Sequence, residues 1–150
     1  MAEASAQFAK SRWFTRGWTL QELLAPPVVR FYSAHWVFLG SRDVLGSQIT
    51  DITRIDRDFL QGRDLRLASI AQRMSWAALR ETSRREDIAY CLLGIFDIHM
   101  PLLYGEGTKA FIRLQEEIMK SVFDYSLFAW GIVDHAPVVP DRSAHDLAGE

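Results

Sequence analysis

Residues 82–96 read TSRREDIAYCLLGIF, and this stretch decides the fold class because a helix start stands directly before an apolar run. Ser83 and Glu86 have the spacing of a capping box, in which each side chain bonds the backbone N–H of the other residue. Ile88, Leu92 and Ile95 then recur at helical intervals. The stretch therefore predicts a capped helix with one buried face.

Two further helical patterns flank this stretch. On its N-terminal side SIAQRMSWAAL begins at Ser69, a favourable N-cap, and on its C-terminal side TKAFIRLQEEIMKSV places apolar residues on one face with charges outside. We predict that these helices pack together. The predicted core consists of Ile70, Met74, Trp76, Ile88, Leu92, Ile95, Phe111, Leu114 and Ile118.

The first third of the chain predicts smaller elements. A short helix is expected from Thr15, as N-cap, to Leu24, because Pro26-Pro27 stops it. The runs VVRFYS and HWVFLGS predict a hairpin near residues 28–39, and the following segment predicts a weaker helix. With a strand-like run DYSLFAWGIV after the last helix, the predicted class is α+β, mostly α, with a small β-hairpin and four to five helices.

Composition limits the classes of protein. Apolar residues make up 49% of the 150 residues and the formal charge is −2, with acids and bases interleaved, so nucleic acid is not expected as a partner. No run approaches the length of a membrane span, no secretory signal is visible, and the location expected is cytoplasmic. The chain is expected to divide into five parts: a disordered lead-in (1–10), a segment with the first short helix (11–27), the hairpin with a connecting helix (28–66), a helical region (67–130) and a flexible tail (131–150).

The residues that could bind a metal or act as a nucleophile have no suitable partners nearby in the sequence. The four histidines have no ligand at metal-binding spacing, so no metal and no cofactor is expected. Cys91 lies in an apolar run and is predicted to be a buried small side chain rather than a nucleophile.

Two polar motifs allow alternatives. YGEGTKAF, residues 104–111, could hold a phosphate at a helix N-terminus, although the P-loop spacing is absent and a glycine turn is favoured. SRRED, residues 83–87, favours a solvated first helical turn over a binding site.

Glu22 is a third such case, because it follows Trp18 by one helical turn. The indole could desolvate this carboxylate for acid–base work or for stabilising a cation, or Glu22 could be a solvated residue paired with Arg12 or Arg16. The spacing alone favours the solvated pair.

The motif SRWFTRGWTLQELLAP, from residue 11, resembles the closing motif of the fungal heterokaryon-incompatibility (HET) domain. Residues 67–130, with RMSWAA, EDIAYCLLGIFDI, MPLLYGEG and LQEEI in order, resemble the conserved region that follows this domain in such fungal proteins. The larger front part of the domain, with its SYVWG-like and WIDALCINQ-like segments, is not found in this sequence. We therefore expect an incomplete HET domain, in which Trp13 and Trp18 form an exposed patch for the missing half or for a partner.

HET domains are considered distant relatives of Toll/interleukin-1 receptor (TIR) domains, some of which cleave NAD with a glutamate in a W-x-x-x-E-L helix. Trp18 to Leu23 has that spacing, so the resemblance implies Glu22 as the catalytic carboxylate. Because the nucleotide-contacting loops would lie in the missing part, we expect no NAD cleavage by this chain alone.

The resemblance implies a role in fungal non-self recognition and programmed cell death after incompatible cell fusion. The function expected first is protein interaction, through a partner or self-association at residues 11–27. The alternative is a TIR-like NAD-cleaving domain that needs a partner or the missing N-terminal half.

Overall fold

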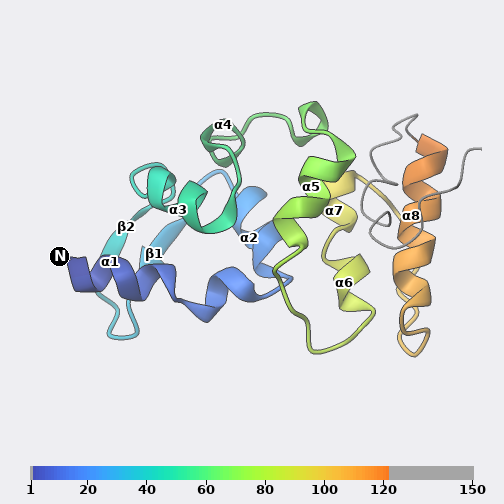
Figure 1. Ribbon diagram of the computed structural model, residues 1–150, viewed down its shortest axis with the longest axis horizontal. Coiled ribbons are helices and arrows are strands. Elements are labelled where there is room, and N and C mark those ends of the chain that lie inside the picture. Colours follow the sequence, from blue (N-terminus) through green and yellow to red (C-terminus); the bar gives the residue numbers. More distant parts are fainter. Residues whose placement is uncertain (1, 122–150) are drawn as a thin grey trace, which may run out of the picture.

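The computed structural model describes residues 2–121 as one elongated body (Figure 1). Helix α1, the hairpin and α3 lie at one end of its long axis, and α8 lies at the other. The elements are α1 (Ala2–Ala9), the 3-10 helix η1 (Arg12–Thr15), α2 (Thr19–Leu24), β1 (Arg30–Tyr32), β2 (Phe38–Ser41), α3 (Gly46–Thr53), α4 (Arg57–Leu60), the 3-10 helix η2 (Leu65–Leu67), α5 (Ile70–Ala77), α6 (Asp87–Tyr90), α7 (Leu93–Phe96) and α8 (Lys109–Ser121).

The predicted α+β class is confirmed, but the helices are shorter and more numerous than the four to five expected. The helix predicted over 82–96 is divided into α6 and α7, and only α8 reaches 13 residues. The strand-like run DYSLFAWGIV and the predicted tail 131–150 lie outside the described residues.

The helix predicted from Thr15 to Leu24 is divided because its middle pairs with a distant segment. Arg16 and Glu81 form an isolated parallel β-bridge, in which Glu81 N–H donates to Thr15 O at 2.6 Å and Gly17 N–H donates to Glu81 O at 2.9 Å. These bonds take backbone groups that a continuous helix would need. Thr15 therefore ends η1 instead of capping a helix, and α2 starts at Thr19.

Close packing explains the glycine beside this bridge. A Cβ added at Gly17 would lie 2.5 Å from Thr82 Cγ2 and 3.2 Å from Cys91 Sγ, so no larger residue fits without movement. Arg80 crosses the same junction and donates to Arg16 O at 2.9 Å and to Thr19 Oγ1 at 2.8 Å. Burial lowers the pKa of Arg80 to about 10. The segment around Gly17 is thus fixed to the segment 80–91 within this chain.

The hairpin forms where the sequence predicted it. Its strands are antiparallel, with Phe31 opposite Gly40 and a register irregularity between Phe31 and Tyr32. The turn is closed by Ser33 N–H donating to Val37 O at 2.9 Å, and Trp36 adopts a left-handed conformation with φ 61°. A bulky residue rarely takes this conformation.

A buried arginine attaches the hairpin to α2. Arg42 directly follows β2, and its guanidinium donates to Leu23 O at 2.6 Å and to Pro27 O at 3.0 Å. A guanidinium offers five donors and suits carbonyl groups left open at a helix end. The position of the strands relative to α2 is therefore fixed from one side of the hairpin.

The predicted disordered lead-in 1–10 is wrong, because Ala2–Ala9 form α1. Phe8 from this helix packs edge-to-face on Phe14 and Phe31, with ring centroids 5.1 and 5.2 Å apart. Such aromatic pairs add to the free energy gained by burial. The helix is held by aromatic contacts that its small-residue sequence did not indicate.

Most of the predicted core is buried, with two exceptions. Ile88 is 46% exposed, because the packed side of the short helix α6 carries Ala89 and Tyr90 instead. Phe111 of α8 is half-buried and packs at the margin of the core. The core also extends into the first half of the chain, beyond the prediction. The additional buried residues include Leu20, Leu23, Ile49, Ile55, Phe59 and Leu60.

Ser69 caps α5 as predicted, with its side chain accepting from Gln72 N–H at 3.1 Å. None of the helices in the described range is long and apolar enough to cross a membrane.

Candidate functional site

Glu22 lies on α2 with its side chain exposed to solvent. Its backbone N–H bonds Trp18 O at 3.4 Å, so the predicted one-turn separation is present. Within residues 2–121, no ion pair joins it to Arg12 or Arg16, and neither of the two pockets described below has it in its wall. Glu22 therefore lies at the surface and outside the walls of these two pockets.

The two tryptophans predicted to form an exposed patch differ in exposure. Trp13 is half-buried and packs edge-to-face on Phe14 and Phe31, with centroids 5.2 and 5.5 Å apart. Trp18 is 37% exposed, so only part of one indole is available to solvent. The aromatic residues of 11–27 find their packing partners in Phe8 and Phe31, which lie outside the motif.

The loop before α8 is occupied by a carboxylate of this chain. Gly105 and Gly107 donate their backbone N–H groups to Glu86 Oε1 at 2.7 and 3.0 Å. The pKa of Glu86 is lowered chiefly by its own backbone N–H and then by those of Gly107 and Gly105. The glycine turn expected in YGEG is present, and its amides bind Glu86 in the position where the alternative interpretation placed a phosphate.

Two predictions about SRRED are therefore wrong. Glu86 and Asp87 are buried rather than solvated, and Ser83 makes no cap for α6, whose N-cap residue Glu86 directs its side chain to the loop. Asp87 accepts from Tyr104 Oη at 2.8 Å, and Arg84 lies 4.8 Å from the Tyr104 ring centroid. The capping-box spacing is used for a tertiary contact instead.

A second set of bonds completes this attachment, which we call the α6–loop clamp (Glu86, Asp87, Tyr90, residues 101–107 and Arg113). Tyr90 Oη donates to Glu106 Oε1 at 2.9 Å and accepts from Leu103 N–H at 2.7 Å. Arg113 from α8 pairs with Glu106 and donates to Pro101 O at 3.0 Å. Because all these groups have partners within the chain, the clamp is a structural feature that holds α8.

Cys91 is buried, as predicted, and burial raises its pKa to about 11. A thiol of this kind is a poor nucleophile at neutral pH. In the described part of the chain, no group of three or more His, Cys, Asp or Glu side chains could hold a metal ion.

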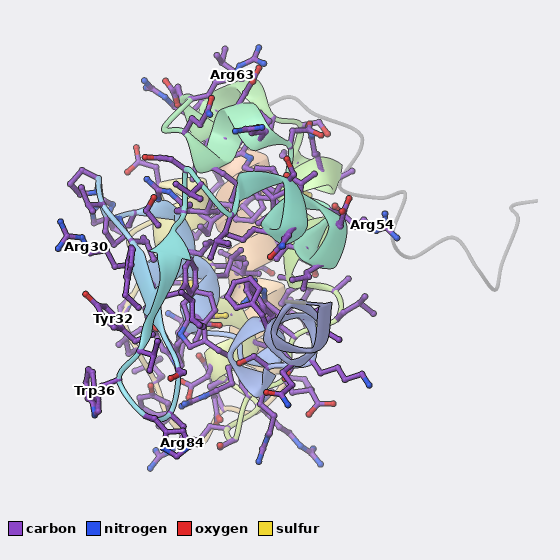
Figure 2. The ribbon with its side chains drawn as sticks, turned by 90° about the vertical axis from the view of Figure 1, so that its left-hand side faces the viewer. Arg30, Tyr32, Trp36, Arg54, Arg63 and Arg84 are labelled. Carbon is purple, nitrogen blue, oxygen red and sulfur yellow. The ribbon has the colours of Figure 1, made fainter. Side chains whose placement is uncertain are left out.

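The hairpin exposes apolar side chains that the sequence analysis did not single out. Figure 2 shows Arg30, Tyr32 and Trp36 in succession along it, pointing away from the body. Trp36 is 83% exposed, and the Tyr32 ring lies 5.5 Å from that of Phe38 and 6.1 Å from that of Trp36. We call the exposed residues of this segment the hairpin face; its members are Val28, Arg30, Tyr32, Trp36, Val37, Phe38 and Leu39.

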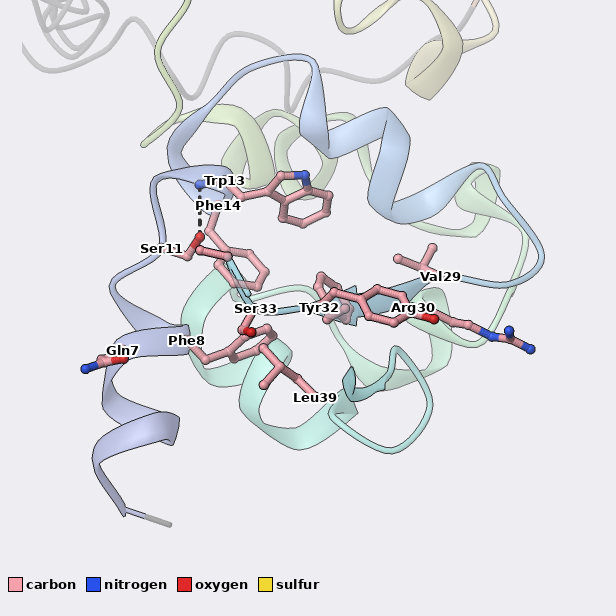
Figure 3. A pocket seen from close by; sticks show the side chains of 12 residues that line it. Gln7, Phe8, Ser11, Trp13, Phe14, Val29, Arg30, Tyr32, Ser33 and Leu39 are labelled. Carbon is pink, nitrogen blue, oxygen red and sulfur yellow. Dashed lines mark hydrogen bonds between the residues drawn. The ribbon is translucent and has the colours of Figure 1, made fainter. Parts of the chain in front are cut away.

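A pocket of about 550 Å³ adjoins the hairpin face (Figure 3). The rings of Phe8, Trp13 and Phe14 line one side, and Tyr32 and Leu39 of the hairpin line the other. Arg30 extends from this wall to the outside. The hairpin face is thus continuous with an aromatic hollow, whereas a second pocket of about 460 Å³ lies elsewhere, between the Pro26-Pro27 turn and residues 59–65.

A signal for this surface was present in the sequence. The run RFYSAHWVFLG, residues 30–40, lacks the alternation of polar and apolar residues that a strand with one solvated face shows. Apolar residues on both sides of a strand indicate two covered faces. Within the described residues, one face of this hairpin is covered, where the rings of Phe8 and Phe14 pack against Phe31.

Comparisons with known proteins identify relatives. The chain is 51% identical over 114 residues to the vegetative incompatibility protein HET-E-1 of Podospora anserina. The aligned region covers 75% of this chain and 8% of that protein. Residues 109–149 match a family described as a domain of unknown function (DUF8212). No solved structure matches the chain. This chain is therefore a homologue of a small segment, about 8% of the length, of a fungal vegetative incompatibility protein.

Proposed function

We propose that this chain acts in fungal vegetative incompatibility as a protein-interaction unit without catalytic activity of its own. Support comes from the 51% identity to a vegetative incompatibility protein. The resemblance of residues 11–27 and 67–130 to HET-type proteins supports the same role, and with it a contribution to programmed cell death.

The observation that carries the interaction role is the hairpin face. Tyr32, Trp36 and Phe38 are exposed side by side, although burying one large aromatic side chain gains about 1.5–3 kcal/mol. Contiguous exposed apolar residues with a basic neighbour, here Arg30, are typical of protein-binding surfaces. We therefore assign the interaction to the hairpin face, beside the residues 11–27 that the sequence analysis proposed for it.

A growth assay tests this proposal. The full chain is expressed in a filamentous fungus, beside Trp36→Ser and a control, Leu79→Ser, which removes an apolar side chain of similar exposure outside the hairpin face. Growth inhibition is expected for the wild-type chain and for Leu79→Ser, and it is lost with Trp36→Ser. Normal growth with the wild-type chain would exclude a cell-death role for this chain, and equal inhibition by all three would exclude the hairpin face.

A TIR-like NAD-cleaving activity is the second candidate, with Glu22 as the carboxylate that stabilises the leaving nicotinamide's ribosyl cation. The W-x-x-x-E spacing on α2 favours it. Since Glu22 is exposed and lines neither pocket, such an activity would need walls supplied by other residues. Nicotinamide release from purified protein that disappears in Glu22→Gln would replace the interaction proposal by this one.

A further inference from the structure

The pocket beside the hairpin runs along β1. Six consecutive residues, 29–34, line it, whereas β2 contributes Leu39 alone. Because successive side chains of a strand point to opposite faces, consecutive residues line one hollow when it lies along the edge of the strand rather than over one face. On the other side, α1 and η1 supply the rings of Phe8, Trp13 and Phe14 (Figure 3). The edge of β1 is therefore one wall of an aromatic pocket.

The backbone at this edge is free to pair. In the described residues the sheet has two strands, and no backbone N–H or C=O of Arg30–Tyr32 or of residues 38–40 bonds a residue outside the hairpin. An open strand edge can bind an extended peptide, whose main chain pairs with the edge while its alternate side chains enter pockets beside it. The edge of β1 and its pocket offer both parts of this binding mode.

The cations around the pocket are available to a partner. Arg30 lines the pocket, and Lys10 and Arg12 are exposed on either side of Ser11, which also lines it. None of these three cations forms an ion pair in the part of the chain that the structure describes, and the residues of the pocket wall include no acid. The ion pairs in that part involve Arg63, Arg66, Arg113 and Lys120. The charge at the pocket therefore favours a negatively charged occupant.

The sequence that builds this end of the molecule has the same bias. Residues 4–42 hold five bases and one acid, Glu22, which lines neither pocket, although the whole chain has a formal charge of −2. Two copies of the hairpin face would bring like charges together, so electrostatics opposes a second copy as the occupant. The exposed rings of Tyr32, Trp36 and Phe38 favour an occupant that is also apolar. An acidic segment with large apolar side chains satisfies both conditions.

We propose that the edge of β1 binds an extended, acidic segment of another protein. The segment adds a strand to the hairpin, places one aromatic or large aliphatic side chain in the pocket, and directs carboxylates toward Arg30, Lys10 and Arg12. This inference names the partner chemistry of the surface in the proposed function and rests on that function. Because the contacts lie along one strand edge, a short peptide is enough for binding.

The test is the selection of random peptides of about twelve residues, displayed on phage, against the full chain. Selection is expected to enrich peptides that combine several carboxylates with an aromatic or leucine side chain. The dissociation constant of an enriched peptide is then measured by fluorescence anisotropy. Methylation of every second backbone nitrogen of the peptide should abolish binding in one register and spare it in the other, because an added strand bonds the edge through alternate residues only.

Two variants with matched controls locate the bound peptide. Arg30→Glu is expected to weaken binding about tenfold, whereas Arg85→Glu, the same change at an exposed arginine before α6, leaves it within about twofold. Ala34→Trp adds an indole at an exposed position of the pocket wall and is expected to weaken binding by about tenfold or more. Ala78→Trp, at the exposed end of α5, has no effect. An unchanged unfolding transition confirms that each variant keeps the fold.

Several results overturn the inference. They include the enrichment of peptides without acids, the absence of any enrichment, and equal binding of both methylated registers. A molar mass that rises with concentration in light scattering, and returns to that of a monomer with Ala34→Trp, would assign the pocket to a second copy instead. Binding to phosphatidylserine vesicles that is lost with Trp36→Ser would assign the face to a membrane.

Failure of the proposed function gives a different result. If Trp36→Ser abolishes growth inhibition but no acidic peptide is selected, the hairpin face keeps its role and only the partner chemistry fails. If acidic peptides bind as expected but Trp36→Ser leaves growth inhibition unchanged, the peptide site stands and the proposed function fails.

Discussion

The two ends of the molecule differ in how their side chains are used. At the α8 end, the α6–loop clamp pairs Glu86, Tyr90 and Arg113 with groups of the same chain. At the hairpin end, Tyr32, Trp36 and Phe38 remain exposed, and Trp36 has a left-handed backbone. The first arrangement satisfies polar groups within the fold, whereas the second leaves large apolar side chains in contact with solvent.

The largest effect on stability is expected when a charge is placed in the interior. Leu92 is 1% exposed, and Leu92→Asp is expected to cost about 4 kcal/mol or more because it buries a carboxylate among apolar residues. Denaturant unfolding followed by near-ultraviolet circular dichroism measures the loss. Ile88→Asp, in the same stretch but 46% exposed, is the matched control and is expected to cost less than about 1 kcal/mol. Equal losses would show that α6 faces the wrong way.

The next effect concerns the junction between the two halves of the chain. Gly17→Ala places a methyl group 2.5 Å from Thr82 Cγ2, and the overpacking is expected to cost about 1–3 kcal/mol. Thr82→Ser removes that methyl group, so the double variant regains most of the stability. Gly94→Ala, whose new Cβ meets only the Gln21 side chain at 3.4 Å, is neutral or stabilising. Additive losses in the double variant would contradict the contact.

A smaller effect, dependent on pH, is expected in the α6–loop clamp. Glu86→Gln keeps the size of the side chain but loses the charge that accepts from Gly105 and Gly107, so the melting temperature falls by several degrees at pH 7. Because the folded pKa of Glu86 is lowered from 4.5, its stabilisation is complete above that pH and is lost as pH falls below it. The difference between wild type and variant therefore shrinks in acid.

Glu117→Gln supplies the control for that experiment. Glu117 pairs with Lys120 on the exposed side of α8, and such surface pairs contribute about 0–1 kcal/mol. A pH dependence in Glu117→Gln as large as that in Glu86→Gln would mean that the effect comes from overall charge rather than from the loop.

The smallest effect on stability is expected at the hairpin face. Trp36→Asn is predicted to leave the unfolding free energy unchanged or to raise it by up to about 1 kcal/mol, because asparagine tolerates the left-handed conformation that Trp36 adopts. Thermal unfolding measures this change, and the growth inhibition proposed for the wild-type chain should be lost in the same variant. A clear destabilisation would show that the indole supports the fold and is not reserved for a partner.

The elements that the sequence predicted well are those with strong local signals. The Ser69 cap, the face of α8 with Leu114 and Ile118, and the place of the hairpin follow from neighbouring residues alone. The errors arise where distant segments decide the structure. Glu81 divides the helix predicted from Thr15, and the Gly105 and Gly107 amides draw Glu86 away from its predicted cap.

The exposure of the candidate site residues also depends on distant segments. Trp13 and Trp18 stand out by residue type, but exposure depends on partners such as Phe8 and Phe31 that no local pattern reveals. The hairpin face carried a readable signal, the lack of polar alternation in residues 30–40, because that pattern concerns both faces of one strand.

The burial of Cys91 gives the protein a built-in reporter of its own opening. It is the single thiol in 150 residues, its pKa is raised to about 11, and its sulfur lies 3.2 Å from the position that a Gly17 side chain would take. Alkylation by iodoacetamide must then wait for the segments around Gly17 and Cys91 to separate. The alkylation rate relative to a free cysteine peptide therefore measures how often the two halves of the chain part in the native state.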